Sequence, residues 1–170
     1  ERLSLFRQSV DALIAIQQQG EMPLSHIDLG EVAEQFGVQE ARSVADKLIS
    51  QMPSSFLSDI REIAYLYPDE ELGQIILGMA ATSDGQQALL SKLSDIYSPT
   101  ESWANEVDAS VVREVLLSAR VEQYEILLKV KNLENYFSPD ELSQYATKIL
   151  NTIPTMALED SSFFEKYIPG

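Results

Sequence analysis

The chain contains a single histidine, His26, and no cysteine. A catalytic triad needs a histidine beside a nucleophile, and a zinc site needs several histidine or thiolate ligands. The sequence also lacks a glycine-rich phosphate loop, a G-x-S-x-G nucleophile turn and an EF-hand calcium loop. We therefore expect His26 to be a surface or capping residue, and we expect neither a cofactor nor a metal.

Carboxylates are the other residues that could do chemistry, and several occur in close pairs. The pairs are Glu70 with Glu71, Glu122 with Glu125, and Asp140 with Glu141. A di-iron site in a helical bundle needs Glu-x-x-His motifs, which this sequence does not have. Acidic residues at a helix start interact favourably with the positive end of the helix dipole. The sequence thus predicts a non-enzymatic protein, and an enzyme that uses carboxylates alone remains the catalytic alternative.

One segment has the spacing of a helix-turn-helix, because residues 32–38 contain an alanine and a glycine turn and Val44 follows. The second helix of this segment balances Arg42 and Lys47 with Glu40 and Asp46. The whole chain has 12 basic and 27 acidic residues and a formal net charge of −15. Binding to nucleic acid needs clustered lysine and arginine. We therefore expect no nucleic-acid partner.

The composition is that of a globular protein, with 170 residues of which 45% are hydrophobic and 23% charged. No apolar run reaches the length of a membrane span, so we expect none. The absence of cysteine and of a signal peptide in this chain favours a cytoplasmic location. Because the first residue is Glu1 and not Met, we expect the chain to be a fragment of a larger protein.

The elements that position these residues are predicted to be helices throughout, because apolar residues recur every three or four positions. The expected helices cover residues 2–19, 28–36, 39–51, 55–66, 69–81, 83–97, 108–131, 139–152 and 155–168. The longest of them is predicted from a seam of apolar positions that runs from Val112 to Phe137. We expect Leu48, Ile49, Ile149 and Leu150 to be buried.

The sequence also contains a possible duplication, in which residues 28–69 align without a gap with residues 129–170, an offset of 101. Pro53 and Pro68 correspond to Pro154 and Pro169, and the apolar positions of the helix before the first proline, residues 39–51, coincide with those of residues 140–152. Convergence of two amphipathic patterns is the simpler alternative. The duplication predicts helical hairpins in a tandem repeat of about 100 residues. Residues 1–101 would form the first unit, and residues 102–170 a truncated second unit packed on it, with one compact domain as the alternative.

Four residues near the end of the chain form a candidate partner-binding face: Phe163, Phe164, Tyr167 and Ile168. Helical spacing places Phe164, Tyr167 and Ile168 on one side, with Phe163 nearby. This face either packs back on the body or binds a partner. Trp103, the single tryptophan, is expected to anchor the core between the two halves.

These observations predict an acidic all-α module that binds another protein as an adaptor, regulator or scaffold. Tandem helical hairpins favour this function because they form extended grooves. One alternative is a helical ligand-binding or sensor domain with an apolar pocket. Another is an acidic mimic of nucleic acid that inhibits a DNA-binding protein. The sequence does not indicate the oligomeric state.

Overall fold

The computed structural model describes residues 1–18, 28–58, 60–94 and 103–168, and every regular element in these ranges is helical. The all-α prediction is therefore confirmed. The elements are α1 (Arg2–Gln18), α2 (Leu29–Phe36), α3 (Val38–Gln51), α4 (Pro53–Ser58), α5 (Ile60–Ile63), η1 (Ala64–Leu66), α6 (Asp69–Ala80), α7 (Ser83–Ser94), η2 (Trp103–Asn105), α8 (Ala109–Leu117), η3 (Val121–Gln123), α9 (Tyr124–Leu127), η4 (Leu133–Asn135), α10 (Pro139–Thr152), α11 (Met156–Glu159) and α12 (Ser161–Tyr167), where η denotes a 3-10 turn.

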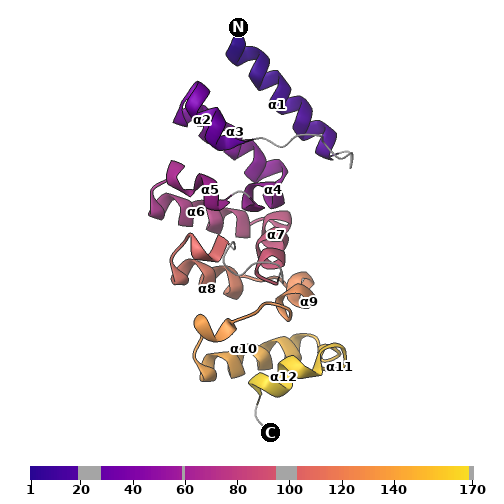
Figure 1. The fold of residues 1–170 in the computed structure, drawn as a ribbon. Coiled ribbons are helices and arrows are strands. Elements are labelled where there is room, and N and C mark those ends of the chain that lie inside the picture. The colour runs from indigo at the N-terminus through magenta and orange to yellow at the C-terminus, as the bar shows by residue number, and fades with distance from the viewer. Residues whose placement is uncertain (19–27, 59, 95–102, 169–170) are drawn as a thin grey trace.

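The helices are stacked in chain order along one axis, with α1 at one end and α12 at the other (Figure 1). Helices α3, α6, α8 and α10 follow one another on one side of the stack, and α4, α7, α9 and α12 follow one another on the other side. Within hairpins, α3 packs on α4 and α6 on α7. Between hairpins, α4 packs on α7, α7 on α9 and α6 on α8. The result is an elongated pile of helical hairpins.

One continuous apolar core runs through this stack from Val10 to Phe164. Trp103 lies within it with 1% of its surface exposed, and its indole Nε1 donates a hydrogen bond to the carbonyl oxygen of Leu89 at 3.0 Å. The prediction that Trp103 is a core residue is confirmed. Its contact ties the segment after residue 102 to α7.

The prediction of one long helix over residues 108–131 is wrong, because α8 ends at Leu117. The side chain of Gln86, which is fully buried, holds the break. Its amide nitrogen donates to the carbonyl oxygen of Ser118 at 2.8 Å, and its amide oxygen accepts from the backbone nitrogen of Arg120 at 2.9 Å. The backbone groups that would have continued the helix are thus satisfied by a residue distant in the sequence.

The predicted helix over 155–168 is also divided, into α11 and α12. The predicted helix over 55–66 is described as α4 before and α5 after residue 59, which lies outside the described residues, and it ends in the 3-10 turn η1. At the break between α11 and α12, Asp160 leaves the helical conformation, and its carboxylate accepts a hydrogen bond from the backbone nitrogen of Phe163 at 3.3 Å. Aspartate favours such a cap because it satisfies a backbone donor that has no partner within the helix.

Burial agrees with the prediction at two of the four positions named for it. Leu48 is 4% exposed and Ile149 is fully buried. The prediction is wrong for Ile49 and Leu150, which are only half-buried and pack at the edge of the core. Ile49 lies on the margin of its helix's apolar face, where it lines a surface cavity.

Arginine side chains join successive hairpins in a recurring arrangement, which we call the arginine clasp. In the last example, the Arg113 guanidinium lies 5.0 Å from the ring centroid of Phe137. It donates to the backbone oxygen of Tyr136 at 3.2 Å and forms an ion pair with Glu141. Arg113 is in α8, whereas Glu141 is the third residue of α10, so the clasp connects one hairpin to the next.

The same three contacts occur between α3 and α6. The Arg42 guanidinium lies 4.9 Å from the ring centroid of Tyr67 and 3.6 Å from a carboxylate oxygen of Glu71. It also donates to the backbone oxygen of Leu66 at 2.8 Å. Glu71 is the third residue of α6, as Glu141 is of α10.

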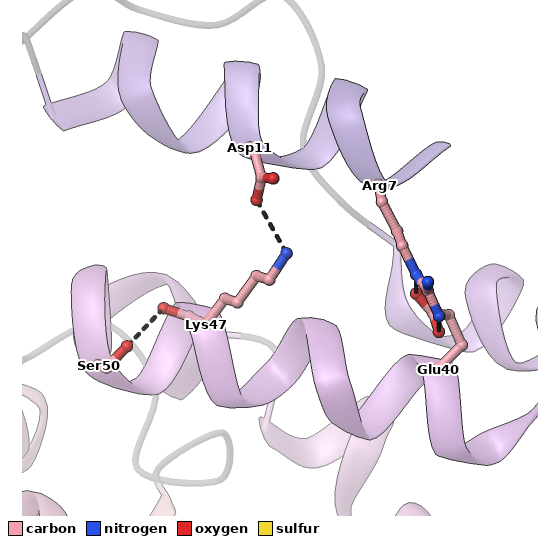
Figure 2. A network of polar contacts seen from close by, with 5 residues as sticks. All are labelled: Arg7, Asp11, Glu40, Lys47 and Ser50. Carbon is pink, nitrogen blue, oxygen red and sulfur yellow. Dashed lines mark hydrogen bonds and ion pairs between the residues drawn. The ribbon is translucent and has the colours of Figure 1, made fainter. Parts of the chain in front are cut away.

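Two arginines of α1 make the corresponding contacts with α2 and α3. Arg2 lies 5.7 Å from the ring centroid of Phe36, and Arg7 forms two hydrogen bonds with Glu40, the third residue of α3 (Figure 2). Figure 2 also shows Asp11 of α1 accepting a hydrogen bond from Lys47 of α3. These charged contacts hold α1 on the first end of the stack.

The interface between α6 and α8 replaces the clasp with an apolar contact. Gly73 is the fifth residue of α6, the position that Arg42 has in α3, and Val111 is the third residue of α8. A Cβ atom at Gly73 would lie 3.2 Å from a methyl group of Val111. The positions that hold the arginine and the glutamate of the clasp therefore face one another here as well. At this interface they are occupied by a glycine and a valine.

Candidate functional site

The four predicted site residues lie on and just after α12, which packs on α10. Phe163 and Phe164 are 7% and 6% exposed, and Tyr167 and Ile168 are half-buried. The ring of Phe163 contacts those of Phe164 and Tyr167, with centroids 5.3 and 5.0 Å apart. The two phenylalanines thus attach α12 to the body, and partner binding by this face stays a prediction.

The α10–α12 hairpin is the last hairpin of the described part of the stack (Figure 1). Leu158 of α11 is 87% exposed. Leu57, which precedes it by the offset of 101 residues, is 2% exposed because α4 packs on α7. Among the described residues no hairpin covers Leu158 in this way.

The same contrast holds for two of the predicted site residues. Tyr167 and Ile168 are half-buried, whereas their counterparts at the offset of 101, Leu66 and Tyr67, are 3% and 6% exposed. Tyr67 is covered by the clasp of Arg42. Among the described residues, Leu158, Tyr167 and Ile168 are therefore less covered than the residues that precede them by 101 positions.

A cavity of about 410 Å³ lies beside this surface, between α12 and residues 128–134. We call it the lysine groove, because three of the chain's 12 basic residues line it. Its lining consists of Leu128, Lys129, Val130, Lys131, Asn132, Glu134, Asp160, Ser162, Phe163, Lys166 and Tyr167. Two of the predicted site residues, Phe163 and Tyr167, are part of it.

Both carboxylates of the lysine groove already have partners. Glu134 accepts a hydrogen bond from the hydroxyl of Tyr167 at 3.3 Å and lies 3.8 Å from the Lys166 ammonium. Its own backbone amide, followed by the charge of Lys166, holds the pKa of Glu134 below its usual range. Asp160 caps α12. Both side chains are therefore held by their neighbours.

Lys129 and Lys131, in contrast, make no ion pair with any described residue, and both are exposed. They lie on the irregular segment between α9 and η4, where Asn132 adopts a left-handed conformation with φ of 60°. Asparagine tolerates this conformation better than most residues do. The sequence analysis missed this site because it placed both lysines in the expected long helix.

The other residues considered for chemistry do not converge. Glu71 and Glu141 are each engaged by an arginine clasp, and Glu122, Glu125 and Asp140 are exposed. Within the described ranges, no group of three or more histidine, cysteine or acidic side chains is placed to hold a metal ion. His26 lies outside the described residues.

Two further cavities lie between helices. One of about 560 Å³ is bordered by α3, α6 and α7, with Ile49, Ile75 and Met79 in its lining. The other, of about 280 Å³, lies between α1 and α2, where Phe6 and Phe36 stack with their ring centroids 4.6 Å apart. As for a membrane span, none of the helices in the described part of the chain combines the length and apolar character required.

Comparison with known proteins gives no relative from which a function could be transferred. No protein family matches the chain, and no similar curated protein or solved structure was found.

Proposed function

We propose that this protein is a non-enzymatic, acidic helical module that binds another protein, as an adaptor, regulator or scaffold. The observation that carries this proposal is the exposure of apolar residues on the last described hairpin, where Leu158 is 87% exposed and Tyr167 and Ile168 are half-buried. An exposed apolar surface next to a polar rim is typical of a protein-interaction site. Stacked hairpins also present a long, continuous surface on which a partner protein can bind.

The tandem repeat of about 100 residues with a truncated second copy stays a prediction, and we propose a shorter repeat unit in its place. Helices α3, α6, α8 and α10 begin at residues 38, 69, 109 and 139, so the offset of 101 residues covers three hairpin steps. α3 and α10 are equal in length. The residues that follow them have similar backbone conformations, with φ of −142° at Met52 and −134° at Ile153. We infer that the stack is a helical repeat whose unit is one hairpin. In each inner hairpin one surface packs against the next hairpin. On the last described hairpin, the same surface would then be the one that a partner binds.

The test is affinity capture from cells that contain the protein, with the full chain, Leu158→Asp and Leu5→Asp as baits. Leu5 is the matched control, because it is 64% exposed and lies on α1 at the opposite end of the stack. We expect proteins that are retained by the wild type and by Leu5→Asp, and a loss of at least about tenfold with Leu158→Asp. Equal retention by all three baits, or no specific retention by any, would contradict the proposal.

The ligand-binding alternative is supported by a different observation, the cavity of about 560 Å³ between α3, α6 and α7. This volume lies in the usual range for small-molecule sites. A thermal-shift screen with metabolites tests the alternative, because a bound ligand raises Tm in a concentration-dependent way. Ser50→Trp would fill the cavity mouth and abolish the shift, since Ser50 is exposed and lines the cavity.

A further inference from the structure

The lysine groove differs in charge from the rest of the molecule. In a chain of net charge −15 it brings together Lys129, Lys131 and Lys166, facing only two carboxylates. Glu134 and Asp160 are engaged by neighbours, whereas Lys129 and Lys131 have no ion pair with any described residue. At physiological salt, charges are screened beyond about 8 Å, so a bound group in the groove responds mainly to these nearest charges.

Apolar side chains lie beside the lysines. Leu128, Val130 and Phe163 line the groove and are 8%, 7% and 7% exposed, so they are fixed by the core while a small part of each faces the groove. Such a surface accepts an apolar side chain without having to reorganise. A ligand that combines carboxylates with an apolar group would complement both parts.

We propose that the lysine groove binds an acidic segment of a partner protein, with carboxylates paired to Lys129 and Lys131 and an apolar side chain placed against Phe163. This inference rests on the proposed function and specifies the chemistry of the partner. Pairing of an unpartnered lysine with a carboxylate adds a charge-assisted hydrogen bond, which is stronger than a neutral one.

A nucleic acid fits the groove less well. Its affinity depends on neutralising many phosphates along the backbone, and the described ion pairs leave only two unpaired lysines here. The two carboxylates of the groove and the net charge of −15 would repel a polyanion at the periphery. A short acidic peptide, in contrast, needs to pair only with the lysines of the groove.

The experiment measures fluorescence anisotropy of the full chain with three dye-labelled peptide pools of equal length. One pool alternates acidic with apolar residues, one basic with apolar residues, and one neutral polar with apolar residues. A single-stranded DNA oligonucleotide forms a fourth arm. We expect the acidic pool to bind most tightly, and its binding to weaken as salt is raised.

The variant that tests the site is Lys129→Glu with Lys131→Glu, and its matched control is Arg61→Glu with Lys148→Glu. All four side chains are exposed, so both variants make the same change in charge without disturbing the core. We expect the groove variant to weaken binding of the acidic pool by at least about tenfold, because each lost pair is a charge-assisted contact. The control variant should bind within about twofold of the wild type.

Each other outcome overturns the inference. If the acidic pool binds no more tightly than the neutral pool, if both variants lose binding equally, or if only the oligonucleotide binds, the groove is not an acidic-peptide site. Leu158→Asp in the same assay separates this failure from that of the proposed function. If a neutral or basic pool binds and Leu158→Asp abolishes its binding, the interaction module stands and only the groove is refuted. If nothing binds and affinity capture retains nothing, both proposals fall.

Discussion

The side chain of Gln86 determines where α8 ends. It is fully buried, and its amide satisfies the carbonyl of Ser118 and the backbone nitrogen of Arg120. A polar group in this position is stabilising only while both of its partners remain in place, because an unsatisfied buried group keeps its full desolvation cost.

We therefore predict that Gln86→Leu destabilises the protein by about 1–3 kcal/mol, since it keeps a similar volume but leaves two backbone groups without partners. Urea denaturation followed by circular dichroism measures the change. Gln87→Leu is the matched control, because the neighbouring Gln87 is exposed and should tolerate the change within about 0.5 kcal/mol. Equal effects of the two substitutions would show that the amide does not hold the break.

Glu141 gives the arginine clasp a pH dependence. Hydrogen bonds from the Arg113 guanidinium and from the backbone of Ser138 lower the pKa of Glu141 to about 2. Since a free glutamate titrates near pH 4.3, the unfolded chain takes up this proton first as the pH falls. The carboxylate therefore contributes stability above about pH 4.3, and this contribution is lost as the pH falls toward about 2.

The corresponding prediction compares the wild type with Glu141→Gln at several pH values. The difference in free energy of unfolding should be constant at neutral pH and shrink between about pH 4.3 and 2, where the wild-type carboxylate becomes protonated. Denaturant titrations measure this difference. A difference that does not depend on pH would mean that the Arg113–Glu141 pair does not stabilise the fold.

At the scale of elements, the turn between α6 and α7 depends on a close backbone approach at Gly85. A Cβ atom there would collide with the backbone oxygen of Met79 and would lie 2.7 Å from the hydroxyl oxygen of Thr82. Gly78, in the last turn of α6, has no neighbour within 4 Å of its hypothetical Cβ and is exposed. A side chain is therefore excluded at Gly85, whereas Gly78 in the same hairpin has room for one.

We predict that Gly85→Ala destabilises the hairpin by about 1–3 kcal/mol, because the backbone that it meets cannot move aside. Gly78→Ala should stabilise the protein by about 0.5–1 kcal/mol, because alanine favours the helix. Thermal unfolding of both variants checks the two signs. Destabilisation by Gly78→Ala would show that this position is closely packed.

The elements that the sequence predicted well are those whose ends are encoded locally. The bounds of α3 and α10 agree with the expected 39–51 and 139–152 within one residue, because Gly37 and the capping box of Ser138 and Glu141 mark their starts. The apolar seam faces inward at Val112, Leu116 and Leu133, which are fully buried, whereas Ala119 and Ile126 are only half-buried.

The breaks and the lysine groove were not predictable in this way. The helix over 108–131 is interrupted by Gln86, which lies 32 residues before Ser118 in the sequence. No local pattern encodes this contact, because the residues around the break retain helical spacing. Once α9 ends at Leu127, Lys129 and Lys131 leave the helix and face α12.

At the scale of the whole molecule, residues related by the offset of 101 have different surroundings according to their place along the stack. Leu57 is covered by the next hairpin, and Leu158 is not. We predict that Leu57→Ala costs about 2–5 kcal/mol and Leu158→Ala less than about 0.5 kcal/mol. Denaturant unfolding measures both values. A large loss for Leu158→Ala in the isolated chain would show that its surface is covered in solution, for instance by a second copy.

The excess of negative charge should also govern stability as a whole. With 27 acidic and 12 basic residues, most carboxylates have no basic partner, so repulsion among them opposes the compact state. The exposed ion pairs, such as that of Lys47 with Asp11, contribute little in return. Raising the salt from about 0.01 M to about 0.15 M shortens the screening length from about 30 Å to about 8 Å, which weakens long-range repulsion more than short-range pairing.

We therefore predict that Tm rises between these two salt concentrations. Sodium chloride and potassium chloride should act equally, because screening depends on ionic strength and not on the identity of the cation. Differential scanning calorimetry at neutral pH measures the shift. A fall in Tm would mean that the arginine clasps and the other ion pairs outweigh the repulsion.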